Sequence, residues 1–468
     1  MGIISGLDKF FNPGSIALVG ASDKPGKLSG KILESLRSSG FKGKIYPVNP
    51  AYRSVGGQEC YPAIGDIKED VDLAVVAVPA AAAVEALRQT GGKTHAAVII
   101  SGGFSEMGND GARLEKELKD IVRLQGIRVI GPNCMGIYDS FSRLDTFFIS
   151  DDRVGRPGPG SLSIISQSGS FALTAMDELA AEDVGIARVI SYGNRADVNE
   201  SDCLEFLADD DHTGAVAIYM ESVEDGRRFV DAASRCSSKK PVIAVKVGKL
   251  GAGISAARSH TGAIAGRYEI YRAAFKKAGI IELEGYEDFI GGCKAFGMQR
   301  SAAGNRIMII TDGGGIGVGL ADACASMGLD AAPLGKHLKE DMLGSFPGYV
   351  VVGNPFDLTG SVTNEMFADV LEKTMEGDYY DMAIVAPMWG PPQLTDELVD
   401  IIAKKSGVIK KPILICTPGG DYTRKRMGLF HKAGLPAFQT PESTVRAAAA
   451  LSKGVRKGTR PFKAGIHG

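Results

Sequence analysis

The chain has 468 residues, with 53 lysines and arginines against 55 aspartates and glutamates, so its formal net charge is −2. This length exceeds what one hydrophobic core supports and predicts about three domains. The balanced charge argues against a nucleic-acid-binding surface. We therefore expect small molecules or another protein as partners.

The seven cysteines are scattered, with no Cys-x-x-Cys pair and no cysteine–histidine cluster at the spacing of a metal site. This pattern is typical of a reducing compartment, and it predicts no metal site in this chain. The amino terminus has no basic region followed by an apolar core, and no apolar run is long enough to span a membrane. We expect a cytoplasmic protein.

The first part of the chain alternates apolar strands with helices, which is typical of a parallel sheet covered on both faces. It predicts a Rossmann-type domain over residues 1–149. The expected strands are 15–19, 44–49, 73–78, 96–100 and 128–130, and the expected helices are 27–37, 80–89 and 111–124.

The turn after the first strand decides the ligand of this domain. A dinucleotide site requires Gly-x-Gly-x-x-Gly there and an acidic residue at the end of the second strand. Residues 20–26 read Gly-Ala-Ser-Asp-Lys-Pro-Gly instead, and the second strand ends in Asn49 and Pro50. NAD is therefore disfavoured. A phosphorylated ligand whose ribose needs no hydrogen bond from an acidic residue fits this turn better. Residues 101–103 and 131–136 lie at the same sheet edge, although the latter also reads as an ordinary glycine-rich turn.

Residues 150–160 form a predicted linker, and a second unit follows over 161–303. Its expected strands are 161–165, 187–190, 215–220 and 242–247, with a Ser-Gln-Ser-Gly-Ser turn at 166–170 and a helix over 171–180. His260 follows the last strand in a stretch rich in glycine and alanine without aromatic residues. Such a stretch buries little apolar surface, so we interpret it as a mobile loop that presents one imidazole.

The third unit is predicted over 304–455, with a basic tail at 456–468. Its strand 307–310 runs into Thr-Asp-Gly-Gly-Gly at 311–315 and a helix over 320–326, and later strands are 382–386 and 412–416. A helix over 441–451 closes the unit. The openings of the second and third units share one plan: an apolar strand, a turn of small residues and a helix. Trp389 reads as a packing residue, with a pocket role as the alternative.

These turns predict a phosphoryl-transfer chemistry. A helix amino terminus has unsatisfied N–H donors and about half a positive charge, so it binds phosphate without a basic side chain. Two such termini facing each other would hold one phosphoryl group, and the neutral imidazole of His260 would accept it. Glu221, at the end of strand 215–220, is the candidate that holds the other ring nitrogen. The alternatives are a structural histidine whose neighbours cap a helix and a solvated glutamate at a strand end.

Several motifs in this order resemble one family. They are the Ser-Gln-Ser-Gly turn, Tyr-Met-Glu-Ser at 219–222, Ser-His-Thr-Gly-Ala-Ile-Ala-Gly at 259–266 and Gly-Asn-Pro-Phe-Asp-Leu-Thr-Gly at 353–360. They resemble the α subunit of the ADP-forming acyl-CoA synthetases, in the succinyl-CoA synthetase superfamily. The resemblance covers almost the whole chain and implies an α/β fold, with a CoA-binding Rossmann-type domain followed by two flavodoxin-like parallel-sheet domains.

The resemblance implies the reversible reaction acyl-CoA + ADP + phosphate = acid + CoA + ATP, with acetyl-CoA as the expected substrate. Phosphate would displace CoA to give an acyl phosphate, and His260 would carry the phosphoryl group to ADP while Glu221 orients its ring. The implied phosphate-binding residues are Ser168, Gly169, Ser170, Gly313, Gly314 and Gly315. The expected CoA-binding residues are Gly20, Ala21, Ser22, Asp23, Lys44, Asn49, Pro50, Ser101, Gly102, Gly103 and Asn133.

No segment of the chain resembles an ATP-grasp domain, so the resemblance implies that ADP/ATP and Mg²⁺ bind a separate β subunit in an α2β2 complex. A CoA-binding regulatory or acyl-transfer protein without phosphoryl transfer is the first alternative, and an NAD-linked oxidoreductase is the second. Neither the preferred acid nor the physiological direction follows from the sequence.

Overall fold

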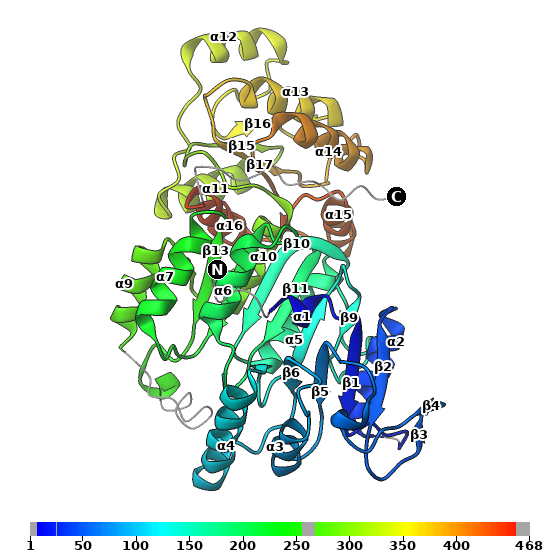
Figure 1. The fold of residues 1–468 in the computed structure, drawn as a ribbon. Coiled ribbons are helices and arrows are strands. Elements are labelled where there is room, and N and C mark those ends of the chain that lie inside the picture. The colour runs from blue at the N-terminus through cyan, green and yellow to red at the C-terminus, as the bar shows by residue number, and fades with distance from the viewer. Residues whose placement is uncertain (1–6, 25, 255–266, 455–468) are drawn as a thin grey trace. The chain divides into compact units, whose positions relative to one another are not determined.

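The computed structural model describes residues 7–24, 26–254 and 267–454, which belong to two compact units (Figure 1). Unit 1 consists of Met1–Ala181 and Gly185–Glu282, and unit 2 consists of Glu182–Val184 and Leu283–Gly468. Within the described ranges, no helix combines the length and the apolar character needed to cross a bilayer. All seven cysteines fall in these ranges, and each is buried with a free thiol.

Unit 1 begins with a five-stranded parallel sheet in the order β2-β1-β5-β6-β7. Its strand β1 alternates, because Ile16 and Leu18 pack into one apolar cluster and Ala17 and Val19 into another on the opposite face. The strands are β1 (Ser15–Val19), β2 (Lys44–Val48), β5 (Leu73–Val76), β6 (Ala96–Ile99) and β7 (Arg128–Ile130). The accompanying helices are α1 (Asp8–Phe11), α2 (Leu28–Ser38), α3 (Ala80–Arg88) and α4 (Asn109–Gln125), and a hairpin is formed by β3 (Ser54–Val55) and β4 (Gln58–Glu59).

The second sheet of unit 1 has seven strands in the order β14-β13-β12-β10-β11-β8-β9. The strands β10 to β13 are parallel, whereas β8 pairs antiparallel with β11. The bounds are β8 (Gly136–Asp139), β9 (Leu144–Asp145), β10 (Pro159–Ser166), β11 (Ile186–Ser191), β12 (Ala215–Met220), β13 (Val242–Lys246) and β14 (Ile281–Leu283). The described helices are α5 (Gly169–Ala181), α6 (Glu200–Asp209), α7 (Gly226–Ser237) and α9 (Tyr268–Ala278). Residues 136–145, which the sequence analysis assigns to the first domain, thus complete the second sheet.

Unit 2 is a third parallel sheet, in the order β16-β15-β17-β18-β19, with helices along it. Its strands are β15 (Ile307–Thr311), β16 (Phe356–Asp357), β17 (Met382–Ala386), β18 (Ile413–Cys416) and β19 (Ala437–Phe438). Its helices are α10 (Tyr286–Met298), α11 (Gly314–Ser326), α12 (Lys336–Ser345), α13 (Asn364–Met375), α14 (Glu397–Ile409), α15 (Asp421–Lys432) and α16 (Pro441–Ser452). Trp389 is buried in this core, where its indole donates to the Thr417 hydroxyl over 2.8 Å, as expected of a packing residue.

The structure confirms the α/β class with parallel sheets, and it shows the same strand–turn–helix opening in β10–α5 and β15–α11. One boundary differs in an informative way. We expected α11 from residue 320, but it begins at Gly314, because the glycines that read as a turn form its first helical turns. This shift places the helix amino terminus directly at the end of β15.

Candidate active site

The turn after β1 requires glycine at position 20. Gly20 has φ +88, and a Cβ there would lie 2.5 Å from Val78 Cγ1. Its N–H donates to the Val48 carbonyl over 2.8 Å, and the Asn49 amide donates to the Ala21 carbonyl over 2.9 Å. The ends of β1 and β2 are therefore tied together, which leaves a backbone-lined edge where an anionic ligand can approach closely.

The next two predicted ligand residues support this turn in different ways. Ser22 is buried, and its hydroxyl accepts the N–H of Lys24 over 3.2 Å. The exposed Asp23 carboxylate accepts the Gly56 N–H over 2.8 and 3.0 Å, which holds the β3–β4 hairpin against the turn. Pro50 is exposed directly after Asn49. These residues are brought together as predicted, although Asp23 supports the protein's own backbone.

Lys44 is not brought to this edge. It is the first residue of β2 and pairs in register with Ser15, whereas Val48 at the other end pairs with Val19 beside the Gly20 turn. Five residues of strand rise about 13 Å, so Lys44 lies at the opposite end of the sheet. Its ammonium group is 3.8 Å from Glu69. Lys44 was predicted as a CoA-binding residue, but the strand direction separates it from the turn after β1.

The strand ends of β6 and β7 bring Ser101, Gly102, Gly103 and Asn133 together. The Asn133 N–H donates to the Ser101 carbonyl over 2.9 Å, and a Cβ at Gly102 would lie 3.2 Å from Asn133 Oδ1. Gly103 has φ +102. These residues form a single glycine-lined surface next to the exposed side chain of Asn133.

Glu106 and Asn194 hold this surface in place, and the sequence analysis did not identify either. The Glu106 carboxylate accepts the Gly103 N–H over 2.5 Å and the Asn194 amide over 2.6 Å. Burial alone would raise the pKa of Glu106, but these hydrogen bonds hold it below its ordinary value. Asn194 follows the end of β11, so the strand-end rule that found Ser101 could have found it too.

The first predicted phosphate cradle lies at the amino terminus of α5. The Ser168 and Ser170 hydroxyls are 3.2 Å apart, and the Phe171 N–H donates to the Ser168 hydroxyl over 3.3 Å. A Cβ at Gly169 would lie 2.4 Å from Cγ of Met135, which comes from the turn after β7. The cradle therefore adjoins the turn that carries Asn133, and α5 directs its first N–H groups to this edge.

Glu221 lies one residue beyond β12, and its side chain is 7% exposed. It is therefore not the solvated glutamate of the alternative interpretation. Its N–H donates to Gln167 Oε1 over 2.9 Å, and Gln167 is the residue that precedes the cradle. The ends of β10 and β12, which are neighbours in the sheet, thus bring Glu221 and the cradle together. His260 lies outside the described residues.

Lys246 is the last residue of β13 and is opposite Met220 in register. It is 1% exposed, and its ammonium group lies 4.7 Å from the ring centre of Tyr271. Burial lowers the pKa of Lys246, while the negative charge of Glu221 acts in the opposite direction. This lysine was not predicted from the sequence, and it adds a buried cation at the same sheet edge.

The second predicted cradle belongs to unit 2. Gly313 caps α11, its N–H donates to the Thr311 hydroxyl over 3.0 Å, and a Cβ at Gly314 would lie 2.7 Å from Asp357 Oδ2. Gly315 is exposed, and a Cβ there would meet no described atom within 4 Å. Backbone N–H groups therefore remain accessible at the start of this helix.

A buried carboxyl group precedes this cradle and was missed by the sequence analysis. Asp312 is 8% exposed and accepts the Met388 N–H over 2.8 Å. Burial, with the nearby charge of Asp357 as a further contribution, raises the pKa of Asp312 to about 6. Its burial depends on the packing of β15 against β17, which residue type alone does not reveal.

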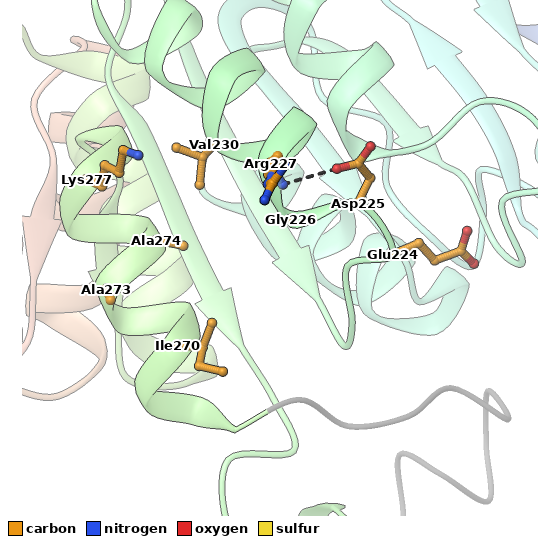
Figure 2. A pocket seen from close by; sticks show the side chains of 9 residues that line it. All are labelled: Glu224, Asp225, Gly226, Arg227, Val230, Ile270, Ala273, Ala274 and Lys277. Atoms are coloured by element: carbon orange, nitrogen blue, oxygen red, sulfur yellow. Dashed lines mark hydrogen bonds between the residues drawn. The ribbon is translucent and has the colours of Figure 1, made fainter.

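An open groove of about 750 Å³ lies between α7 and α9, and Figure 2 shows the side chains that line it. Its floor is apolar, with Val230 from α7 and Ile270 from α9, and Lys277 lies at one end. The Asp225 carboxylate caps α7 by accepting the Arg227 N–H over 3.1 Å. Across the described ranges, no three His, Cys, Asp or Glu side chains are grouped as a metal site.

Three family models match the chain in sequence order. They are a CoA binding domain over residues 14–140, a succinyl-CoA ligase like flavodoxin domain over 159–296 and a Ligase-CoA domain over 307–459. This order agrees with the predicted CoA-binding domain followed by two succinyl-CoA synthetase-like domains.

The similarity to individual proteins extends over nearly the whole chain. Subunit alpha of ADP-forming acetate–CoA ligase I from Pyrococcus furiosus is 35% identical over 457 residues, which cover 96% of this chain and 97% of the relative. ADP-forming acetate–CoA ligase I from Archaeoglobus fulgidus is 36% identical, and the match covers 96% of this chain but only 63% of the relative's length. A solved structure of dinucleotide-forming acetyl-coenzyme A synthetase 1 from Ca. Korarchaeum cryptofilum, in complex with phosphate and ADP, matches with a TM-score of 0.89 and 34% identity, covering 96% of each chain.

Proposed function

Because the chain belongs to the ADP-forming acetate–CoA ligase family, we propose that it is the α subunit of such an enzyme. The reaction is acyl-CoA + ADP + phosphate = carboxylic acid + CoA + ATP, with acetyl-CoA as the substrate. CoA lies along the turn after β1 and the surface formed by residues 101–103 and Asn133. The proposed set omits Lys44, and it comprises Gly20, Ala21, Ser22, Asp23, Asn49, Pro50, Ser101, Gly102, Gly103 and Asn133.

One observation carries this proposal: Glu221 lies beside the Ser168–Gly169–Ser170 cradle, and that cradle adjoins the turn of Asn133 and Met135. Phosphate held by the cradle attacks the thioester carbonyl, CoA leaves as the thiolate, and an acyl phosphate forms. His260 then attacks the phosphorus, which releases the carboxylate. The buried Glu221 accepts a hydrogen bond from the other imidazole nitrogen and stabilises the charge that develops on the ring.

The remaining steps involve a partner and the second cradle. Phosphohistidine transfers its phosphoryl group to ADP, which binds with Mg²⁺ on a separate ATP-grasp β subunit in an α2β2 complex. The name of the Pyrococcus furiosus relative, a subunit alpha, supports a separate partner. Gly313, Gly314 and Gly315 bind the phosphoryl group through the amino terminus of α11. The domain boundaries 1–149, 161–303 and 304–455 also remain part of the proposal, except that residues 136–145 go with the second sheet.

The test uses ³²P-labelled phosphate and a panel of acyl-CoAs with the complex of this chain and its β partner. We expect acid-labile, base-stable label on a peptide that contains His260, and none in the His260→Ala variant, because a phosphoramidate has this stability. The acyl-CoA that supports labelling best identifies the acid. CoA binding without any label would contradict the synthetase mechanism and favour the CoA-binding regulatory protein.

A further inference from the structure

Gln167 connects two parts of the candidate active site. It lies between Ser166, the last residue of β10, and Ser168, the first residue of the cradle. Its side-chain oxygen accepts the N–H of Glu221 over 2.9 Å and the N–H of Ser222 over 3.1 Å. Its amide nitrogen donates to the Ser222 hydroxyl over 3.3 Å. One side chain therefore fixes the backbone from which the Glu221 carboxylate projects.

Arg195 holds the same backbone from beyond the end of β11, the strand on the other side of β10. It follows β11, and its guanidinium donates to the Ser222 carbonyl over 2.7 Å and to the Ser222 hydroxyl over 3.1 Å. The guanidinium also lies 3.7 Å from Glu200 and 3.5 Å from Glu224. The strands β12, β10 and β11 are consecutive in the sheet, so three strand ends are tied together at Glu221 and Ser222.

These groups are shielded from solvent. Gln167, Arg195 and Glu221 are each 7% exposed, and Ser222 is 4% exposed. Hydrogen bonds between buried groups keep their partners in place, because a lost partner leaves a polar group without compensation for its lost hydration. The position of Glu221 relative to the cradle is therefore set by the buried side chains of Gln167 and Arg195.

We propose that Gln167 is a positioning residue for phosphoryl transfer, which fixes Glu221 relative to the phosphate cradle at Ser168, Gly169 and Ser170. The inference rests on the proposed function, since it concerns how that reaction is aligned. A phosphoryl group in the cradle and an imidazole oriented by Glu221 must meet within a narrow range of geometry. Gln167 couples the two because its backbone continues into the cradle while its side chain holds the Glu221 turn.

The test measures the rate of label transfer from ³²P-labelled acetyl phosphate to His260, per folded chain, in the complex with the β partner. Gln167→Met keeps the length of the side chain but removes both the acceptor and the donor. We expect the labelling rate to fall about 10- to 100-fold, the effect of a displacement of about 1 Å at a reacting centre. Hydrogen exchange at the Glu221 and Ser222 amides should become faster in the same variant. If Gln167→Met does not fold, Gln167→Asn, which withdraws the amide by one methylene, should change both readouts in the same direction.

Two variants serve as controls. Gln299 in unit 2 also bridges main-chain groups, since it accepts the Ile413 N–H over 3.2 Å and donates to the Gly434 carbonyl over 2.9 Å. Gln299→Met should lower stability and leave labelling per folded chain unchanged. Ser222→Ala removes the hydroxyl but keeps both main-chain bonds to Gln167, so it should slow labelling by less than about 3-fold.

A double-mutant cycle separates positioning from a general structural role. If Gln167 acts through Glu221, Gln167→Met should slow labelling much less in a Glu221→Gln background than in the wild type, because the group that it positions is already disabled. Independent, multiplying losses would overturn the inference, as would labelling of Gln167→Met within 2-fold of wild type. A wild-type complex that takes up no label would instead overturn the proposed function and this inference together.

Discussion

At the scale of single residues, Asp312, which precedes the second cradle, makes the stability of unit 2 depend on pH. Its pKa is raised by burial from an ordinary 3.8 to about 6, so the unfolded chain loses this proton at lower pH than the folded chain does. Between about pH 4 and pH 6, the contribution of Asp312 to the stability of unit 2 therefore falls as pH rises. Above pH 6, the folded chain carries a buried negative charge beside the amino terminus of α11.

We expect Asp312→Asn to stabilise unit 2 at pH 8 by on the order of 1–3 kcal/mol and to have little effect at pH 4. Asparagine retains an oxygen that can accept the Met388 N–H, so the hydrogen bond is preserved. Thermal unfolding at both pH values, without phosphate, measures the difference. An equal change at pH 4 and pH 8 would contradict the assignment of the effect to this carboxyl group.

His431 changes the stability of unit 2 with pH in the opposite direction to Asp312. Burial, with the positive charge of Lys294 as a smaller contribution, lowers the pKa of His431 to about 4. Its contribution to stability is therefore lost as pH falls from about 6.5 to 4. The two slopes oppose each other in wild type, so Asp312→Asn should reveal a stability that increases with pH across this window.

The residues of the candidate site were predictable to different degrees. Glu221, the cradle serines and the residues near Asn133 follow strands whose carboxyl ends meet, so sequence order predicts their neighbourhood. Gln167, Glu106 and Asp312 matter because of what they hydrogen-bond and how deeply they are buried. Those properties depend on partners far away in the sequence, such as Asn194 for Glu106. Lys44 is a residue that was predicted for the site and does not belong to it. It is a basic residue of β2, but the direction of that strand places it at the opposite end of the sheet.

At the scale of elements, the two cradles use glycine for different physical reasons. Gly169 has no room for a side chain, because its Cβ would lie 2.4 Å from Met135 Cγ, whereas Gly315 is open. Gly169→Ala should destabilise unit 1 by about 1–3 kcal/mol through overpacking. Gly315→Ala should stabilise α11 by about 0.5–1 kcal/mol, since alanine favours a helix, while the added methyl weakens phosphate binding.

Chemical denaturation and phosphate binding, measured on both variants, test this pair. A Gly315→Ala chain that is more stable and binds phosphate as wild type does would exclude Gly315 from the cradle. A Gly169→Ala chain of unchanged stability would show that Met135 moves aside without cost.

The core elements of the three sheets were largely predictable, since continuous apolar strands such as β12 and β17 occur at the expected residues. The helix starts were placed late at α5 and α11, because glycine and serine have low helix propensity and their tertiary role overrides it. The assignment of β8 and β9 to the second sheet was not predictable. The pairing of β8 with β11 joins residues about 50 positions apart, and β9 enters the sheet only by pairing with β8. Local pattern carries no information on a pairing over such a distance.

At the scale of the whole molecule, the division into two compact units predicts more than one unfolding transition. Asp312→Asn should move only the transition of unit 2. Asp197→Ala should move only that of unit 1, because the Asp197 carboxylate accepts the Arg128 guanidinium and the Val129 N–H, each over 2.8 Å. Leaving these groups unpaired should cost roughly 1–3 kcal/mol. Differential scanning calorimetry of both variants tests this, and one shared transition that moves with either substitution would refute it.

The strands β8 and β9 have a consequence for recombination between relatives. A chimera that exchanges residues 1–149 as a module also exchanges two strands of the neighbouring sheet, so the graft would have to rebuild the β8–β11 ladder with foreign side chains. A crossover placed before Gly136 would leave that ladder native to the recipient. The graft would still have to match the recipient at Met135 beside Gly169, at Glu106, which accepts the Asn194 amide, and at Arg128, which donates to Asp197. Exchange of the amino-terminal domain therefore depends on a junction before Gly136 and not on the border expected at residue 149.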